Sequence, residues 1–245
     1  MPQGVLNFSV EGTKESLTSN AGTILFGEYL KATRIDLLCN AHLPLPRSNR
    51  GYTPFEHIQP LLLMLHSGGR VLDDVRMIHR DKAMKEILKI KRLPISESVG
   101  KWIARHGLQG VYGIESMNRV LTQRHLKGVL EPLVLDIDAS VILSQKSTAA
   151  ATYKKQSGYT PIIGHINGGF VIHNEFRSGN IAPADHNLTF VQRCEEQLPP
   201  TRKLDYLRAD SASYQAELFD YCQNHHITYT IGLILTVRCT PTSKR

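Results

Sequence analysis

The apolar residues of this chain follow two different periods, and the change falls at Pro132. Before it, apolar residues recur at helical spacing, and the run 58–65 shows the i, i+3, i+4, i+7 pattern of one helix face. After it, apolar and polar residues alternate, as in 133–143, so that successive side chains fall on opposite faces of a strand. The sequence therefore predicts a helical part followed by a part built on a β-sheet.

The two parts also differ in charge. Residues 1–130 carry 18 Lys or Arg and 11 Asp or Glu, whereas residues 131–245 carry 11 of each, so the whole net charge of +7 lies in the first part. Basic residues favour a polyanion, because neutralised phosphates release counterions, although an ordinary solvated surface is the alternative. We expect a mainly helical, basic DNA-binding region over 1–130 and a separate domain over 131–245.

Composition excludes several classes of protein. With 41% apolar residues the chain can bury a core, which excludes a disordered or fibrous protein. The longest aliphatic or Met run is 61–65, which predicts no membrane span, and no secretory signal is visible. The sequence contains no glycine-rich phosphate loop, so it does not imply a nucleotide cofactor. The four cysteines are widely spaced: Cys39, Cys194, Cys222 and Cys239. We therefore expect neither a disulfide framework nor a structural zinc site, and a reducing, cytoplasmic setting fits this spacing.

The helical part is expected to be a bundle of short helices over 55–128. Its first helix closes at Gly68 and Gly69, and two more follow around 71–78 and 84–88. The residues before it, up to about 50, are mixed, and their prolines and glycine indicate a connecting segment.

One helix of this bundle could read DNA. After Pro94 and a Ser96 cap, the run 93–107 places Trp102 on an apolar side and Lys101 and Arg105 on the other side. Such a helix can enter the major groove as the second helix of a helix-turn-helix while its apolar side holds it to the bundle. A plain packing helix with Trp102 in the core is the alternative.

The second part predicts the order β, β, β, α, β, α, β. Three antiparallel strands cover 133–143, 161–166 and 170–176, and the last two are joined by a short hairpin turn. A helix from Asp185 precedes a fourth strand that ends at Asp210. That helix permits a crossover, so the sheet becomes mixed and the fourth strand can lie beside the first. The last two elements are a helix over 214–225 and a strand over 227–235.

The aspartates of these strands predict a metal site. In the first strand, Leu135 and Ile137 share one face, and Asp136 and Asp138 share the other. Adjacent strands are roughly 4.8 Å apart, so Asp138 and Asp210 could converge, and such carboxylates repel unless Mg²⁺ or Mn²⁺ neutralises them. Two such ions can support phosphodiester cleavage. Aspartates that merely form turns at strand ends are the alternative.

Four runs in this order carry a family resemblance: LDIDAS (135–140), YKKQSGYTP (153–161), EFRSGN (175–180) and LRADSASYQAEL (207–218). From about residue 52 to 232 the chain resembles bacterial insertion-sequence transposases of the DDE class. The resemblance implies an α+β or α/β fold in which the helical bundle precedes a ribonuclease H-like mixed sheet flanked by helices. It also implies metal-dependent cleavage and transfer of double-stranded DNA at transposon ends, and it leaves a homodimer open.

The resemblance places the two catalytic, metal-binding aspartates at Asp138 and Asp210. Asp136 is the alternative for the first position, but family members usually follow that aspartate with a small residue and then Ser or Thr, as Ala139 and Ser140 do here. It also implies a third acidic residue, a glutamate on a helix well beyond the second aspartate. The only glutamate after Asp210 is Glu217, which we expect to face solvent.

The run GLILTVRCTPTSKR (232–245) ceases to resemble the family after Gly232. We therefore expect a core that is truncated at its C-terminus, a missing third ligand, and a chain that is inactive or a remnant. Two other functions stay open: a non-catalytic DNA-binding protein, and a ribonuclease H-like nuclease without transposition.

Three further residues are candidates for DNA contact. Arg177 could bind a phosphate, or its segment could be a surface loop stabilised by Asn180. Lys154 and Lys155, next to Tyr153, could follow a nucleic-acid backbone, and a solvated loop is the alternative.

His225 and His226 are interpreted as a helix end and not as a zinc pair.

Overall fold

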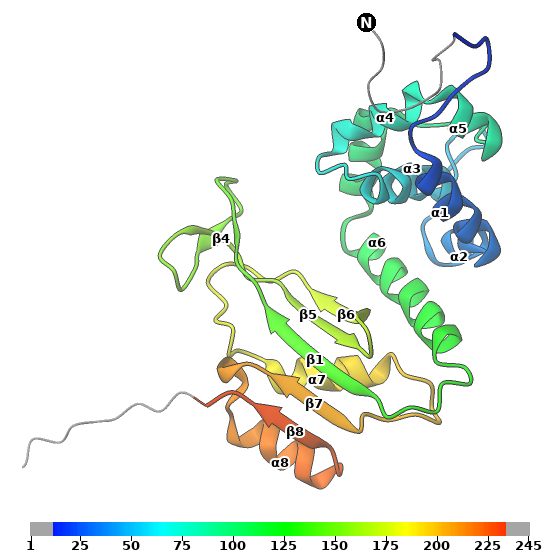
Figure 1. The fold of residues 1–245 in the computed structure, drawn as a ribbon. Helices are drawn as coiled ribbons and strands as arrows, with labels where there is room; N and C mark the ends of the chain where they lie inside the picture. The colour runs from blue at the N-terminus through cyan, green and yellow to red at the C-terminus, as the bar shows by residue number, and fades with distance from the viewer. Residues whose placement is uncertain (1–11, 234–245) are drawn as a thin grey trace, which may run out of the picture. The chain divides into compact units, whose positions relative to one another are not determined.

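The computed structural model describes residues 12–233 (Figure 1). The chain divides into two compact units, Met1–Ile114 and Glu115–Arg245, and the division falls inside one helix, ahead of the change of sequence pattern at Pro132. Each unit has its own buried residues, so each is described by itself. Among the described helices, none has the length and apolar character needed to cross a membrane.

The first unit is helical. Of its helices, α3, α4 and α5 agree with the three predicted from apolar spacing, whereas α1 and α2 were not expected. Helix α3 begins with a capping box, in which the Thr53 side chain accepts from the Glu56 N–H and the Glu56 side chain accepts from the Thr53 N–H. The elements of this unit that precede α6 are α1 (Ala21–Ala32), α2 (Ile35–His42), α3 (Pro54–His66), the short 3₁₀ helix η1 (Leu72–Asp74), α4 (Val75–Arg80) and α5 (Lys82–Ile87).

Helix α6 (Ser96–His125) is two helical segments joined at Gly107, whose φ of 44° and ψ of −129° are not helical. Glycine adopts this left-handed φ without the penalty that a Cβ would bring. The first segment is the helix predicted for 93–107. As expected, Trp102 is buried and Lys101 and Arg105 are exposed.

The second unit is built on a mixed five-stranded sheet in the order β6-β5-β1-β7-β8. Strands β1, β5 and β6 are antiparallel neighbours, and β1, β7 and β8 are parallel. The fourth long strand of the sheet therefore lies beside the first, as predicted, and the ribonuclease H-like fold is confirmed. The strands are β1 (Val134–Ala139), β5 (Ile162–Ile166), β6 (Phe170–Glu175), β7 (Tyr206–Ala209) and β8 (Thr228–Ile231).

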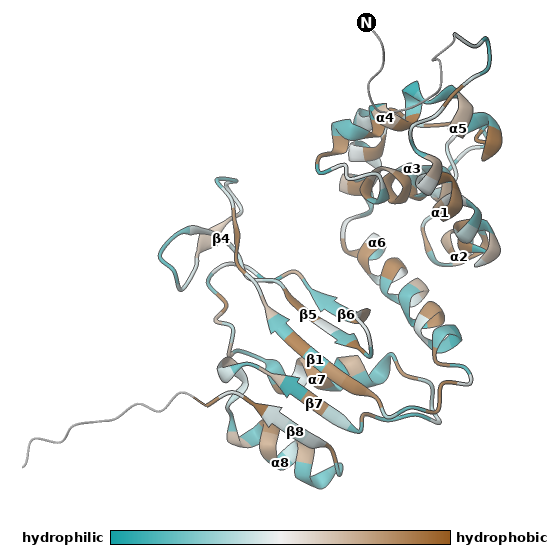
Figure 2. Cartoon of the chain, viewed as in Figure 1, coloured by the Kyte–Doolittle hydropathy of each residue, from teal (hydrophilic) through white to brown (hydrophobic). Residues whose placement is uncertain are grey.

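The core of this unit lies between the sheet and helices α7 (Asn187–Glu196) and α8 (Ala216–Asn224). Leu135 and Ile137 of β1 point into it, as their alternation predicted. Cys194 and Cys222 are fully buried, which confirms that they pack in the core. In Figure 2 the hydrophobic body of β1 gives way to hydrophilic residues near its arrowhead, where the first strand's aspartates lie.

A small second sheet follows β1 and was not expected. It is formed by β2 (Ile142–Leu143), β3 (Ala150–Ala151) and β4 (Ser157–Tyr159), with β4 in the middle. Its strands have two or three residues each, too few for the alternation that reveals a strand in a sequence. Figure 1 shows it extending beyond the end of β1.

Candidate active site

Asp138 and Asp210 lie at the same edge of the sheet. In the parallel pair of β1 and β7, Asp136 is opposite Arg208 and Ile137 is opposite Ala209. The next step of this register brings Asp138 next to Asp210, which directly follows β7. The fold therefore brings together, at the carboxyl ends of two neighbouring strands, the two aspartates that the resemblance implicated.

The two carboxylates differ in their partners. Asp138 is exposed, and no hydrogen bond or ion pair reaches it from the residues that the structure describes. The Oδ1 atom of Asp210 accepts the Ala212 N–H at 3.0 Å, which caps the 3₁₀ helix η2 (Ser211–Ser213). That helix is held in turn by the buried Ser213 hydroxyl, which lies 3.0 Å from Nδ2 of Asn187. Asp210 is thus held in place while its second oxygen is left for a ligand.

Asp136, the alternative candidate, is already engaged. Arg208 donates to it twice, from Nε to Oδ1 at 2.5 Å and from Nη2 to Oδ2 at 2.6 Å. Nδ1 of His165 lies 3.8 Å from Oδ2 of the same carboxylate. The hydrogen bonds to Asp136 raise the pKa of Arg208 above its usual value, so the guanidinium keeps its charge beside Asp136. A carboxylate with two guanidinium bonds is a poor metal ligand, and the geometry favours Asp138.

A third ligand is not present near this edge in the part of the chain that the structure describes. Within residues 12–233, no three side chains of His, Cys, Asp or Glu are grouped to hold a metal ion. Glu217 lies in the first turn of α8 and is exposed, as expected. Residues 234–245, where the sequence was expected to depart from the family, lie outside the described residues.

The oxygen-rich character of Asp138 and Asp210 fits a hard divalent cation, because Mg²⁺ and Mn²⁺ prefer carboxylate oxygens. Two carboxylates alone are a small ligand set for such an ion, so the rest of the coordination shell would be water or phosphate oxygen.

Two of the sequence runs, 153–161 and 175–180, pack against each other. Thr160 donates from its backbone N–H to the Arg177 carbonyl at 3.1 Å and from its hydroxyl to the Ser178 carbonyl at 2.8 Å. Gly179 is so close to the small sheet that a Cβ there would lie 2.4 Å from the carbonyl oxygens of both Ala150 and Gly158. These contacts attach the small sheet to the end of β6.

Arg177 has an internal position and not the expected surface one. Its side chain is 5% exposed, and it donates to Glu175 Oε2 and to the Asp185 carbonyl, both at 2.9 Å. Glu175 also accepts from Arg193 at 3.2 Å. Arg177 therefore holds the segment after β6 against α7 and is not available to a DNA phosphate. From sequence alone, a charged residue is expected on the surface, and for this reason the sequence did not predict the burial of Arg177.

The other expected DNA contacts are exposed. Lys154 and Lys155 lie at the turn between β3 and β4, and Nζ of Lys154 is 5.6 Å from the centre of the Tyr153 ring. Lys101 is bound to Glu97 at 2.6 Å, whereas no described residue pairs with Arg105. These cations belong to two different units.

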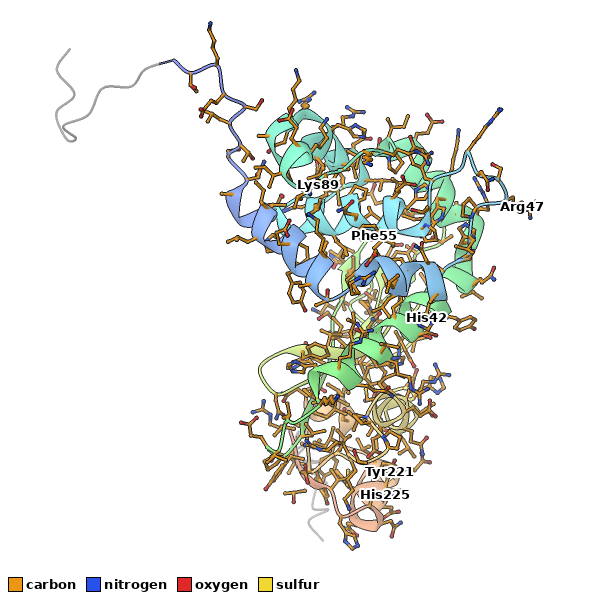
Figure 3. The ribbon with its side chains drawn as sticks, turned by 90° about the vertical axis from the view of Figure 1, so that its right-hand side faces the viewer. His42, Arg47, Phe55, Lys89, Tyr221 and His225 are labelled. Atoms are coloured by element: carbon orange, nitrogen blue, oxygen red, sulfur yellow. The ribbon has the colours of Figure 1, made fainter. Side chains whose placement is uncertain are left out.

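His225 lies at the C-terminal end of α8, where its ring stacks on Tyr221 at 4.0 Å between centres and its Nδ1 lies 2.9 Å from the Tyr221 carbonyl (Figure 3). The interpretation of this histidine as a helix end is confirmed.

Comparison with known proteins gives one family. A family described as transposase DDE domain group 1 matches residues 5–244. Among solved structures, the chain is similar to one titled as the crystal structure of the Mos1 strand transfer complex, with a TM-score of 0.29 and 11% identity over 94% of this chain and 80% of that one. No curated protein matches.

Proposed function

The chain belongs to the group 1 family of transposase DDE domains, and from this premise we propose that it binds the ends of an insertion sequence and that Asp138 and Asp210 are its metal-binding carboxylates. Its proposed partner is double-stranded DNA, which it would bind in the cytoplasm. Because an element has two ends, a second copy of the chain is the other partner that we propose.

The observation that supports this proposal most is the shared edge of β1 and β7. The parallel register brings together two aspartates that are 72 positions apart in the sequence, while Arg208 neutralises the neighbouring Asp136. Two adjacent carboxylates repel each other unless a cation lies between them. A divalent ion bound there would supply Lewis-acid stabilisation to a phosphodiester under attack.

The chain's own residues have distinct tasks in this arrangement. Asp138 offers a carboxylate with no competing partner among the described residues. Asp210 offers one oxygen while its other oxygen keeps the turn at η2 in place. The exposed Lys154 and Lys155, beyond the end of β1, would bind the DNA backbone as it passes this edge.

We further propose that cleavage by this chain is weak. Within residues 12–233 no third acidic side chain joins Asp138 and Asp210, and a metal pair is held poorly by two carboxylates. The same observation favours a second function, a DNA-binding protein without catalysis that occupies the ends of an element.

A nicking assay with an element-end duplex and Mn²⁺ tests these proposals. We expect salt-sensitive binding to the duplex and little or no cleavage. Asp138→Ala tests the site, and Asp220→Asn, an exposed aspartate on α8, is the matched control. Robust cleavage that Asp138→Ala abolishes and the control retains would refute the weak cleavage and support the site. Cleavage of any duplex without preference for element ends would instead favour a nuclease.

A further inference from the structure

The first unit contains a cavity of about 540 Å³ that the active site does not use. It lies between the connecting segment 44–52, the start of α3 and the middle of α6, on both sides of Gly107. No Asp or Glu lines it. The lining residues that carry the argument are Arg47, Tyr52, His57, Trp102, Arg105 and His106.

One wall of the cavity is a row of aromatic rings. The rings of His57 and Trp102 are stacked, with their centres 4.8 Å apart and an interplanar angle of 12°. Tyr52 meets His57 edge-on at 5.6 Å, and His106 meets Trp102 edge-on at 5.3 Å. Such a wall suits a flat ring, because aromatic and apolar surfaces bury planar groups well.

The wall also contains an unsatisfied polar group. His57 is 5% exposed, and its Nδ1 atom has no hydrogen-bond partner in the described structure. Burial lowers the pKa of His57 to about 4, and burial lowers the pKa of His106 as well, so both rings are neutral at pH 7. The Nδ1 atom has almost no accessible surface, so the protein's own atoms cover it and the wall that a ligand would meet is uncharged.

Two arginines supply the positive charge of the cavity. Arg47 and Arg105 are both exposed, and no described carboxylate pairs with either of them. Figure 3 shows Arg47 at the outer edge of its unit. The two arginines favour an anionic group, and the neutral aromatic wall favours a flat ring. A ligand that is anionic at one end and flat at the other would fit both.

The connecting segment that carries Arg47 is held in shape. Arg92 donates to the carbonyls of Arg50 at 2.9 Å and Gly51 at 3.2 Å, and its guanidinium lies 4.6 Å from the centre of the Tyr52 ring. A Cβ on Gly51 would lie 2.6 Å from Cβ of Pro46, so the segment is folded closely on itself. The cavity is therefore largely formed before a ligand arrives.

We propose that this cavity binds a nucleotide, with the base along the Tyr52 and Trp102 wall and the phosphate at Arg47 and Arg105. An aromatic surface takes any base, and guanidinium groups take phosphate. The source of the nucleotide rests on the proposed function: in DNA bound by this chain it is an unpaired nucleotide at an element end, and the other source is a free nucleotide.

Trp102 is the single tryptophan of the chain, so its fluorescence reports on the cavity directly. The probes are deoxyadenosine monophosphate, a blunt duplex, the same duplex with one unpaired 3′ nucleotide, and that duplex with an abasic residue in the unpaired position. We expect the unpaired nucleotide to change the emission with an affinity about tenfold above that of the abasic probe. The blunt duplex should bind in a mobility-shift assay with a smaller change in emission.

Arg47→Ala combined with Arg105→Ala should weaken the fluorescence response about tenfold. Both side chains are exposed, so the fold should survive, and circular dichroism checks this. Arg76→Ala is the matched control, because Arg76 on α4 is an exposed arginine of the same unit, is bound to Asp73 at 3.3 Å and does not line the cavity. It should leave the response to the nucleotide unchanged within about twofold.

The outcomes separate this inference from the proposed function. If duplex DNA binds but no probe with a base changes Trp102 emission, the cavity does not take a nucleotide, and the proposed function stands. An equal response in the Arg47 and Arg105 double variant and in Arg76→Ala overturns the inference too. If deoxyadenosine monophosphate gives the response and no DNA binds, the cavity takes a free nucleotide and the proposed function fails.

Discussion

Arg208 on β7 binds Asp136 on β1 through two hydrogen bonds, of 2.5 and 2.6 Å, directly across the parallel pair of strands. Asp136 and Arg208 each lie two residues before Asp138 and Asp210, so all four residues belong to the same side of the sheet. It therefore gives a structural difference between the two aspartates of this strand: Asp136 has a permanent cation, and Asp138 does not.

The first prediction concerns Arg208→Ala. The Arg208 side chain is 62% exposed, so its loss should change the free energy of unfolding only slightly. The substitution also removes a positive charge beside Asp138 and Asp210, so Mn²⁺ should bind roughly two- to fivefold more tightly. Electron paramagnetic resonance of free Mn²⁺ measures this. Lys203→Ala, the same loss of charge ahead of β7, is the control, and equal effects of the two variants would contradict the prediction.

The second prediction concerns the carboxylates themselves. Asp138→Asn and Asp210→Asn should each weaken Mn²⁺ binding about tenfold or more, because an amide oxygen is a poorer ligand for a hard cation than a carboxylate. Asp136→Asn should have a smaller effect, since that carboxylate is bound to Arg208. The same Mn²⁺ titration tests all three. A larger loss in Asp136→Asn than in Asp138→Asn would move the first ligand to residue 136.

The sequence predicts the sheet well because each long strand carries its own signal. The alternation of Leu135 and Ile137 with the aspartates identified β1, and Gly168 and Gly169, with φ of 78° and 94°, mark the hairpin between β5 and β6. The crossover helix then left little choice about where the fourth strand could go. These features are local or topological, so they can be read without coordinates.

The site depends on contacts that leave no local signal. The bond of Arg208 to Asp136 depends on the register of strands far apart in the sequence, and the cavity beside Trp102 depends on the path of residues 44–52 over α6. The burial of Arg177 depends on Glu175 and the Asp185 carbonyl together. Such arrangements follow from tertiary packing, which periodicity and residue type do not describe.

The third prediction concerns Gly164→Ala on β5. A Cβ at residue 164 would lie 2.6 Å from Sγ of Cys194 and 3.2 Å from Cε1 of Phe190, both fully buried on α7. Overpacking of this kind costs about 1–3 kcal/mol. The Cys194→Ala substitution removes the nearest atom, so the double variant should lose less than the sum of the single losses. Urea unfolding of the four proteins measures the coupling, and simple additivity would mean that α7 moves freely.

The fourth prediction concerns the basic helix in the first unit. Replacing Lys101 and Arg105 with Ala should weaken binding to duplex DNA and lower the slope of its salt dependence by roughly one per lost phosphate contact. Arg105→Ala alone should give most of the effect, because Lys101 is already bound to Glu97 at 2.6 Å. Binding at several salt concentrations tests this. An effect confined to Lys154→Ala and Lys155→Ala would place the main contact on the β3–β4 turn instead.

The last prediction concerns pH and His57. Burial, with smaller effects of the Arg105 and His106 charges, lowers the pKa of His57 from 6.5 to about 4, against an opposing effect of Glu56. The unfolded chain therefore binds a proton that the folded chain excludes. The stability from neutral His57 is complete above pH 6.5 and is lost as the pH falls to about 4, by on the order of 3 kcal/mol.

Trp102 stacks on His57, so its fluorescence follows the unfolding of this region in urea. Other groups also titrate over this range, and the His57→Phe variant separates their contribution, because phenylalanine keeps a flat ring against Trp102 without a titrating nitrogen. Between pH 7 and pH 4 the variant should lose less stability than the natural chain by that same amount. Parallel pH profiles for the two proteins would show that folding does not lower the pKa of His57, and would contradict the prediction.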